Sequence, residues 1–254
     1  MPAFSWSDRD AWAITLDLDW APDFVIDFVA GKLLERQVPA TWMVTHGSPA
    51  VDRLRRHPQL FELGIHPNFL PGSTHGDQPA AVLRHCLHLV PAATSLRTHS
   101  LVQSTPLLAQ VLAQTAITAD VSLFLPHTPH LQPVNYRWGG KTLVRIPFFW
   151  EDDFEMEGAQ PGWQLEPGWP LSPGLKVFNF HPIHIYLNSP DLRAYQRIKK
   201  HPLQDLTAAE AADQIEPGRG TRSFFLELVD YLAEKNPARR VCDLDASWRA
   251  HLGL

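Results

Sequence analysis

The stretch Ile14-Thr15-Leu16-Asp17-Leu18-Asp19-Trp20 combines the apolar residues of a buried strand with two carboxylates two positions apart. Residues two apart in a strand point to the same side, so Asp17 and Asp19 share a face if the strand continues through both. The following Ala21-Pro22-Asp23 ends the strand and opens a helix. Active sites of α/β barrels and doubly wound sheets lie at this carboxyl end of the strands. We interpret the pair as functional; the alternative, that one acid only caps the helix, is weakened because Pro22 and Asp23 can fill that role.

Strand and helix patterns alternate along the chain with short connections. Apolar residues at helical spacing predict a helix over residues 22–37. Further strands are predicted over residues 40–45, 60–65, 94–99, 117–121, 143–150 and 175–180, and further helices over residues 49–57, 79–89, 106–114 and 220–235, the last being the final helix. This order predicts an α/β fold with a parallel sheet and right-handed crossovers. A loop rich in Pro and His is expected over residues 123–139, and loop with helical pieces over residues 191–216.

The composition is that of a soluble globular protein. The 254 residues carry a net charge of −5 without a long basic run, which argues against a nucleic-acid partner. Neither the N-terminus nor any other segment has an apolar run of signal-peptide or transmembrane length, so we expect no membrane insertion and a cytoplasmic location. The two cysteines, Cys86 and Cys242, have no metal-type spacing and fit a reduced compartment. We find no linker and expect a single domain over residues 1–254.

Polar residues suited to chemistry fall at the ends of successive predicted strands. They are Asp17 and Asp19, His46, His66, Arg97 with His99, Asp120, Asp152, and His181 with His184. Strand ends converge in a parallel barrel, so these side chains are candidates for one site. A single histidine at such a position is more often structural, but several of them facing an Asp-x-Asp pair favour a metal site.

The ordered motifs resemble those of a known enzyme family. Ile14-Thr15-Leu16-Asp17-Leu18-Asp19, Ala40-Thr41-Trp42-Met43-Val44 and Glu62-Leu63-Gly64-Ile65-His66 resemble the opening motifs of polysaccharide deacetylases of the NodB-homology type, carbohydrate esterase family 4. Leu96-Arg97-Thr98-His99 is similar to the family's arginine motif, and Phe178-Asn179-Phe180-His181-Pro182 to its closing strand. Within the family, the chain is most similar to the WbmS-type proteins of O-antigen gene clusters. The resemblance implies a distorted, TIM-like (β/α) barrel with about seven parallel strands rather than the usual eight.

The same resemblance implies a role for each matching residue. Asp17 would be the general base, and Asp19 and His66 would be ligands of a divalent metal ion, most simply zinc. Arg97 would orient Asp17 and hold it as a carboxylate. His181 would be the general acid that protonates the leaving amine. Such a metal polarises the acyl carbonyl and activates water, which is consistent with these roles.

The sequence departs from the family at the second metal-binding histidine. The family places it four residues after the first, where this chain has Leu70 in a proline-bearing loop. Our first choice for the third ligand is His99, which ends a neighbouring strand. His75 is the second choice, because its loop leaves His66 and can fold back.

Two further assignments stay open in the sequence. The family's Asp-Trp motif is not clearly present, so either Asp120 or Asp152 could tune His181. Trp150, or a loop with Trp163 and Trp169, could wall a sugar site, although core or loop packing is the favoured interpretation of each of them alone.

We therefore expect a metal-dependent hydrolase that removes an N-acyl group, most simply acetyl, from an amino sugar or polysaccharide precursor in O-antigen biosynthesis. The substrate would be an N-acetylated sugar, or a nucleotide- or lipid-linked intermediate. One alternative is a metal-free hydrolase of another C–N bond. The other is a catalytically silent barrel that binds carbohydrate. A homodimer could form through the apolar face of the helix over residues 220–235, although packing on its own barrel is the simpler use of that face.

Overall fold

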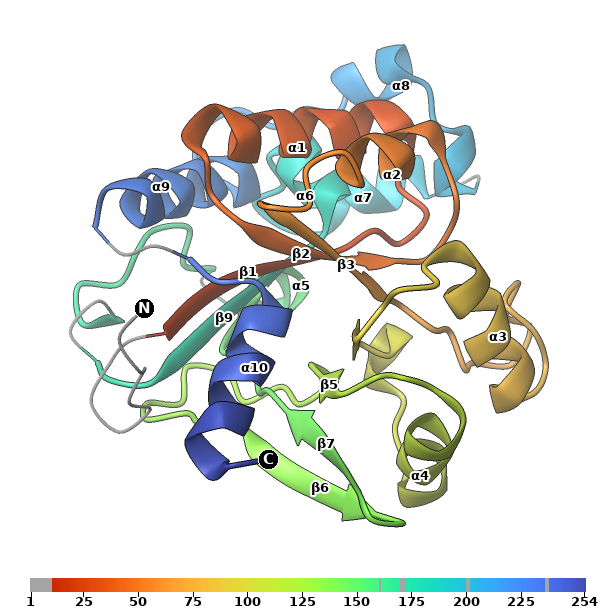
Figure 1. The fold of residues 1–254 in the computed structure, drawn as a ribbon. Coiled ribbons are helices and arrows are strands. Elements are labelled where there is room, and N and C mark those ends of the chain that lie inside the picture. Colours follow the sequence, from red (N-terminus) through yellow and green to blue (C-terminus); the bar gives the residue numbers. More distant parts are fainter. Residues whose placement is uncertain (1–10, 160, 170–171, 200–201, 236–237) are drawn as a thin grey trace.

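A curled sheet of nine strands forms the centre of the computed structural model, which describes residues 11–159, 161–169, 172–199, 202–235 and 238–254 (Figure 1). The strands are β1 (Ala11–Asp17), β2 (Ala40–Val44), β3 (Phe61–Ile65), β4 (Ser95–Leu96), β5 (Ala119–Asp120), β6 (Val134–Trp138), β7 (Lys141–Arg145), β8 (Trp150–Glu151) and β9 (Leu175–Phe180). Their order in the sheet is β6-β7-β5-β4-β3-β2-β1-β9-β8. Among the strands of the described residues, only β6 pairs antiparallel, so the predicted parallel α/β fold is confirmed. The start of the chain, on which the expected lack of a signal peptide depended, lies outside the described residues.

The two ends of the sheet are joined by one segment of chain. β7 pairs with β5 and β8 pairs with β9, yet only residues 146–149 separate β7 from β8. Within this segment the amide of Ile146 donates to Asp120 O (2.8 Å) and that of Phe149 to Val177 O (2.8 Å). When β7 and β8 are counted as one interrupted strand and β6 is set aside, the nine strands give seven parallel positions around a distorted barrel. The barrel is the fold that the motif resemblance implied.

Helices surround this barrel, and the last of them along the chain lies across one of its ends (Figure 1). They are α1 (Asp23–Arg36), α2 (Pro49–Leu54), α3 (Pro79–Leu89), α4 (Thr105–Gln114), α5 (Asp152–Glu157), α6 (Pro182–Leu187), α7 (Arg193–Ile198), α8 (Ala208–Ala212), α9 (Thr221–Glu234) and α10 (Val241–Leu252). The apolar face of α9 is buried within the chain, where Phe224 packs on Trp150 and Phe180. This face is therefore occupied by its own barrel, and the homodimer stays a prediction.

Three sequence predictions need correction. β4 and β5 contain two residues each, shorter than the predicted strands over 94–99 and 117–121. Part of the expected loop over 123–139 is β6, which forms an antiparallel hairpin with β7 through Gly139 and Gly140, both at positive φ. The helix over 220–235 is not the last one, because α10 follows it. β6 alternates apolar and polar residues and is followed by Gly-Gly, so a hairpin signal was present in the sequence that the prediction did not use.

The buried carboxylate of Glu62 on β3 fixes α10 to the barrel. Glu62 Oε2 accepts hydrogen bonds from Thr41 Oγ1 (2.8 Å) and from the amide of Cys242 (2.8 Å), in the first turn of α10. Glu62 Oε1 accepts from Ser95 Oγ (2.7 Å). A negative charge at a helix N-terminus is favourable because it satisfies amides that have no partner within the helix.

We expect Glu62→Ala to lower the free energy of unfolding by about 3 kcal/mol, because it leaves three buried donors without an acceptor. Urea unfolding followed by circular dichroism measures this loss. Glu157→Ala, at an exposed position of α5, is the matched control and should change stability by less than about 0.5 kcal/mol. Equal stabilities of the two variants would show that Glu62 does not anchor α10.

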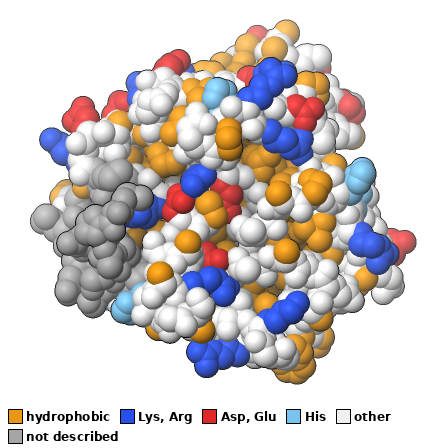
Figure 2. Space-filling view, viewed as in Figure 1, with side chains coloured by type: hydrophobic (Ala, Val, Ile, Leu, Met, Phe, Trp, Pro, Cys, Tyr) orange, Lys and Arg blue, Asp and Glu red, His pale blue; other side chains and the backbone are white. Residues whose placement is uncertain are grey.

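The face of the molecule shown in Figure 2 carries basic side chains scattered among acidic and apolar ones rather than gathered in one area. The absence of a nucleic-acid partner stays a prediction from the composition. Among the helices that the described residues form, none has both the length and the apolar composition needed to cross a membrane.

Candidate active site

The two acids of the opening stretch lie on either side of a sharp change in backbone direction. β1 ends at Asp17, and both Asp19 (φ 43°) and Trp20 (φ 57°) adopt the left-handed conformation. The strand therefore ends before Asp19. The two acids would have shared one face only if the strand had continued through both, so this condition is not met. The turn nevertheless directs both carboxylates toward His66. The helix α1 is capped at Pro22 without a side-chain hydrogen bond, so neither acid acts as its cap.

Asp17 is buried, with 3% of its surface exposed, and both its oxygens accept hydrogen bonds. Arg97 Nη1 donates to Oδ1 (3.0 Å), and Asn179 Nδ2 donates to Oδ2 (3.0 Å). Burial alone would raise the pKa of Asp17, but the charge of Arg97 and those of the nearby His66 and His181 outweigh it, so the pKa lies below its usual value. The carboxyl is thus held ionised, as a general base must be.

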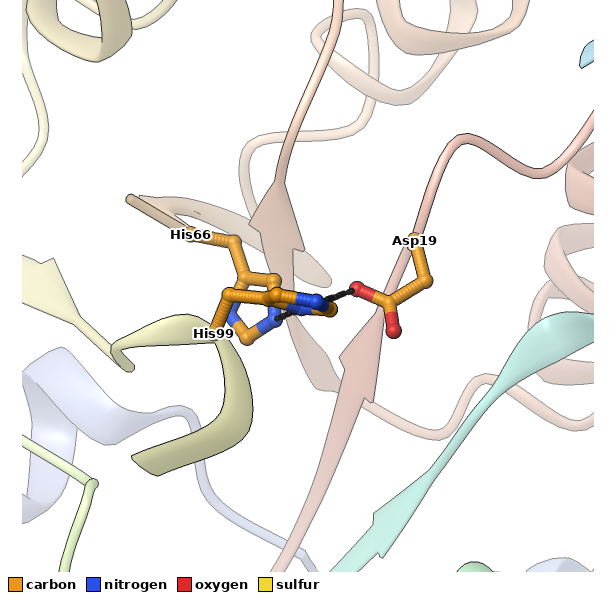
Figure 3. Close-up of side chains that lie close together, drawn as sticks. All are labelled: Asp19, His66 and His99. Carbon is orange, nitrogen blue, oxygen red and sulfur yellow. Dashed lines mark hydrogen bonds and ion pairs between the residues drawn. The ribbon is translucent and has the colours of Figure 1, made fainter. Parts of the chain in front are cut away.

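Three potential metal ligands lie close together in the site: Asp19, His66 and His99 (Figure 3). Asp19 Oδ1 lies 3.2 Å from His66 Nε2 and 3.2 Å from His99 Nδ1, and the two histidine nitrogens are 3.3 Å apart. Burial opposes the charge of Asp19, yet its hydrogen bonds to His66 and His99 bring its pKa well below the usual value. The three side chains come from the loops after β1, β3 and β4.

The distances among these three atoms fit a tetrahedral metal ion. Nitrogen and oxygen ligands about 2.0–2.1 Å from such an ion lie about 3.3–3.4 Å from one another. His66 Nδ1 lies 2.8 Å from Arg97 O, and because a carbonyl only accepts, Nδ1 must carry the proton. Nε2 donates to Asp19 when it also carries a proton, and once it loses that proton its lone pair can bind a metal ion, the arrangement seen in metal-binding histidines.

The alternative third ligand, His75, is occupied elsewhere. Its Nε2 lies 2.8 Å from Thr45 O, and its Nδ1 accepts from the amide of Asn68 (3.1 Å). Burial, with a contribution from the neighbouring His85, lowers the pKa of His75 to about 4, so it is neutral and ties its loop to β2. Leu70, where the family has its second histidine, is 39% exposed in a segment without helix.

His181, at the end of β9, is held by a neighbouring acid. Its Nδ1 lies 2.7 Å from Asp152 Oδ1, and Asp152 Oδ2 accepts from the backbone amide of His181 (2.8 Å). Burial would lower the pKa of His181, but Asp153, Asp152 and Asp19 together raise it well above its usual value. The ring is therefore cationic and suited to donate a proton from Nε2, which lies 3.6 Å from Asp19 Oδ2.

The other candidates from the strand ends lie farther from this centre. Asp120 pairs with Arg145 (2.7 Å), so of the two acids considered for tuning His181 the structure brings Asp152 to it. His184 Nε2 lies 2.9 Å from Asp153 Oδ1. His46 lines the cavity and contacts Thr45 Oγ1.

An open cavity of about 1140 Å³ leads to these residues. It is lined by Asp17, Asp19, His66, His99 and His181, and on its walls by Trp20, His46, Glu151, Tyr195 and Lys199 among others. Trp150 and Trp163 are buried and Trp169 packs against the core, so core packing is the correct interpretation of those three. Trp20, which packs edge-on against His99, supplies an aromatic wall instead. The cavity is large enough for a sugar.

Asn179 and Glu151 are site residues to which the sequence analysis gave no role. Asn179 Oδ1 accepts from Arg97 Nη1 and from Thr15 Oγ1 (3.0 Å), while its Nδ2 donates to Asp17 and to Glu151 Oε1 (3.1 Å). A signal for Asn179 was present, because it is a polar residue in an apolar strand two positions before His181. Thr15 is likewise a polar residue in an apolar strand, two positions before Asp17.

Similarity to known proteins identifies the family of this chain. A profile of the WbmS-like family, described as polysaccharide deacetylase, matches residues 14–199. The chain therefore belongs to the WbmS-like polysaccharide deacetylases. The crystal structure of WbmS from Bordetella bronchiseptica, assigned as a polysaccharide deacetylase involved in O-antigen biosynthesis, is similar at 32% identity and a TM-score of 0.75, over 89% of this chain and 91% of that one. No curated protein sequence matched the chain.

More distant structures are also similar to this WbmS-like deacetylase. The peptidoglycan deacetylase PdaC of Bacillus subtilis is 10% identical over 98% of this chain and 96% of its own, with a TM-score of 0.45. A family 4 acetyl xylan esterase of Clostridium thermocellum, solved with cobalt, is 14% identical over 96% of this chain and 92% of its own, with a TM-score of 0.45. Family membership makes the WbmS-like deacetylase a hydrolase that acts on carbohydrate, as the motifs implied.

Proposed function

We propose that the protein is a metal-dependent N-deacetylase that removes the acetyl group from an amino sugar of a surface-polysaccharide precursor, such as an O-antigen intermediate linked to a nucleotide or lipid. The observation that carries the proposal is the convergence of three potential metal ligands, Asp19, His66 and His99. Beside them lie the carboxylate of Asp17, which Arg97 keeps ionised, and the cationic ring of His181. The similarity to the Bordetella protein supports the O-antigen context.

In this mechanism the residues divide the proton transfers. Asp17 takes a proton from the attacking water, since Arg97 and Asn179 keep its carboxylate ionised and fixed. His181, held by Asp152, gives its proton to the leaving nitrogen so that the amine departs neutral. Asp19, His66 and His99 would hold the divalent ion, for which zinc suits the ligand set. When bound, that ion polarises the acyl carbonyl and lowers the pKa of water.

The metal content of the purified protein tests the proposal. We expect near-stoichiometric zinc, or another first-row metal, in the wild type by inductively coupled plasma mass spectrometry. Asp19→Ala, His66→Ala and His99→Ala should each reduce bound metal to about a tenth or less, because each removes one of three ligands. His75→Ala is the matched control and should retain the metal, since its ring binds backbone groups.

The same preparations then need an activity assay. Release of acetate from N-acetylated chitooligosaccharides should require the metal and stop on chelation. A wild type without metal after incubation with zinc, cobalt or nickel would refute the metal-dependent mechanism and favour a metal-free C–N hydrolase. Bound metal together with oligosaccharide binding but no turnover would favour the silent carbohydrate-binding barrel.

A further inference from the structure

Glu151, the last residue of β8, adds a further carboxyl beside the two acid–base residues of the site. Oxygen and nitrogen atoms of Asp17, Glu151 and His181 lie within 4.8 Å of one another, and Glu151 lines the cavity. The mechanism above uses Asp17 and His181 and gives Glu151 no task. A carboxyl group at the point where the scissile bond must lie therefore needs an explanation.

The orientation of Glu151 is set by Asn179. The amide oxygen of Asn179 faces donors, Arg97 Nη1 and Thr15 Oγ1, so its nitrogen must face acceptors. This Nδ2 donates one hydrogen to Asp17 Oδ2 (3.0 Å) and the other to Glu151 Oε1 (3.1 Å). One amide thus fixes both carboxyls, and Oε2 of Glu151 remains available to the cavity.

The positive charges near Glu151 do not fully offset the cost of burying its carboxyl. Within the described part of the chain no Lys or Arg side chain forms an ion pair with it. Burial, opposed in part by the charges of His181 and Arg97, raises the pKa of Glu151 to about 7. A group that donates a hydrogen bond or acquires positive charge beside it would therefore be favourable.

We propose that Glu151 is the specificity residue that accepts the N–H of the scissile amide, and so selects N-acyl over O-acyl substrates. This inference rests on the proposed function. The leaving atom must lie near His181 Nε2 to receive its proton, and that places it near Glu151. An amide nitrogen at this position carries a hydrogen that Oε2 can accept, and the departing amine carries more. An ester oxygen carries none and presents only lone pairs to the carboxyl.

Glu151→Gln tests this proposal with little change in shape. Asn179 Nδ2 keeps the side-chain oxygen of the glutamine toward itself, so the new NH₂ group faces the cavity and meets the substrate N–H donor to donor. We expect kcat/KM for tetra-N-acetylchitotetraose to fall about 10- to 100-fold, the range for a hydrogen bond to a charged group. For O-acetylated xylotetraose we expect a change of less than about twofold, since no such bond is made. Glu157→Gln is the matched control and should alter neither value.

The outcomes separate this inference from the proposed function. An equal loss on both probes, or no loss on the N-acetylated one, overturns the role of Glu151. If the wild type turns over neither probe, the proposed function fails, and calorimetric binding of the N-acetylated tetramer still decides the inference. The wild type should then bind this tetramer at least about tenfold more tightly than Glu151→Gln, and equal affinities overturn the assignment.

The pH dependence of Tm shows whether Glu151→Gln folds like the wild type. A glutamate whose pKa is raised from 4.5 to about 7 in the folded state binds its proton more tightly there than in the unfolded chain. It therefore lowers stability progressively as pH rises through this window. Glu151→Gln should match the wild type in Tm near pH 4 and exceed it at pH 8. A lower Tm at both pH values would mean that the glutamate is a structural residue.

Discussion

Asp17→Asn should reduce acetate release from N-acetylated chitooligosaccharides by about 10³-fold while leaving metal and oligosaccharide bound. The amide cannot take a proton from water, although it occupies the same volume as the carboxylate. Asp17 is not among the three side chains that converge at the candidate metal site, so metal content should stay near the wild-type value. Single-turnover kinetics together with metal analysis measure the two quantities on one preparation.

The control for this substitution is Asp52→Asn, an exposed acid on α2 that should leave activity unchanged. Asp17→Asn also places an NH₂ group against Arg97 or Asn179, both of which donate to this carboxylate, so a lower Tm is expected. Activity within about tenfold of the wild type, in a folded variant with metal bound, would show that another group is the base. Glu151 would then be the next candidate.

The sequence was sufficient to predict where the site lies because the strand pattern locates the carboxyl ends of parallel strands. Five candidate residues lie at or just past the ends of such strands, and the structure brings them together: Asp17, Asp19, His66, His99 and His181. The choice of His99 over His75 also followed from strand order. Their roles stay proposals, since position alone does not show chemistry.

The choice between Asp120 and Asp152 could not be made from sequence. Both lie at or just past the ends of predicted strands, and both are fully buried. What separates them is the side of the barrel on which each strand pairs. β5 lies beside β7 and puts Asp120 against Arg145, whereas β8 lies beside β9 and puts Asp152 against His181. That information depends on how the segment over residues 146–149 crosses between the two ends of the sheet, which no local pattern encodes.

Arg97→Leu should lower the free energy of unfolding by about 3–5 kcal/mol at pH 7. Arg97 is fully buried, its Nε donates to Val121 O (2.8 Å), and its Nη1 is shared by Asp17, Thr15 and Asn179. Its guanidinium also lies over the Phe148 ring, 4.4 Å from the centre. Leucine fills the apolar part of this space but leaves Asp17 as a buried charge without its cation. Chemical denaturation at pH 7 measures this loss of stability. Arg97→Lys keeps the positive charge but not the planar guanidinium with its several donors, so it should be destabilised less than Arg97→Leu.

The pH dependence shows whether the lost charge pair is the cause. In the wild type the depressed pKa of Asp17 contributes stability that is present above 3.8 and disappears as pH falls through the lower, folded value. Without Arg97 the largest cause that lowers this pKa is lost, so the pKa rises and the contribution of the ionised carboxylate to stability shrinks. The deficit of Arg97→Leu should therefore be largest near pH 7 and shrink toward pH 4. Combining it with Asp17→Asn should cost less than the sum of the two, because the neutral amide no longer needs the cation. Strictly additive losses, constant with pH, would mean that Arg97 acts through packing on Phe148 and not by holding the carboxylate.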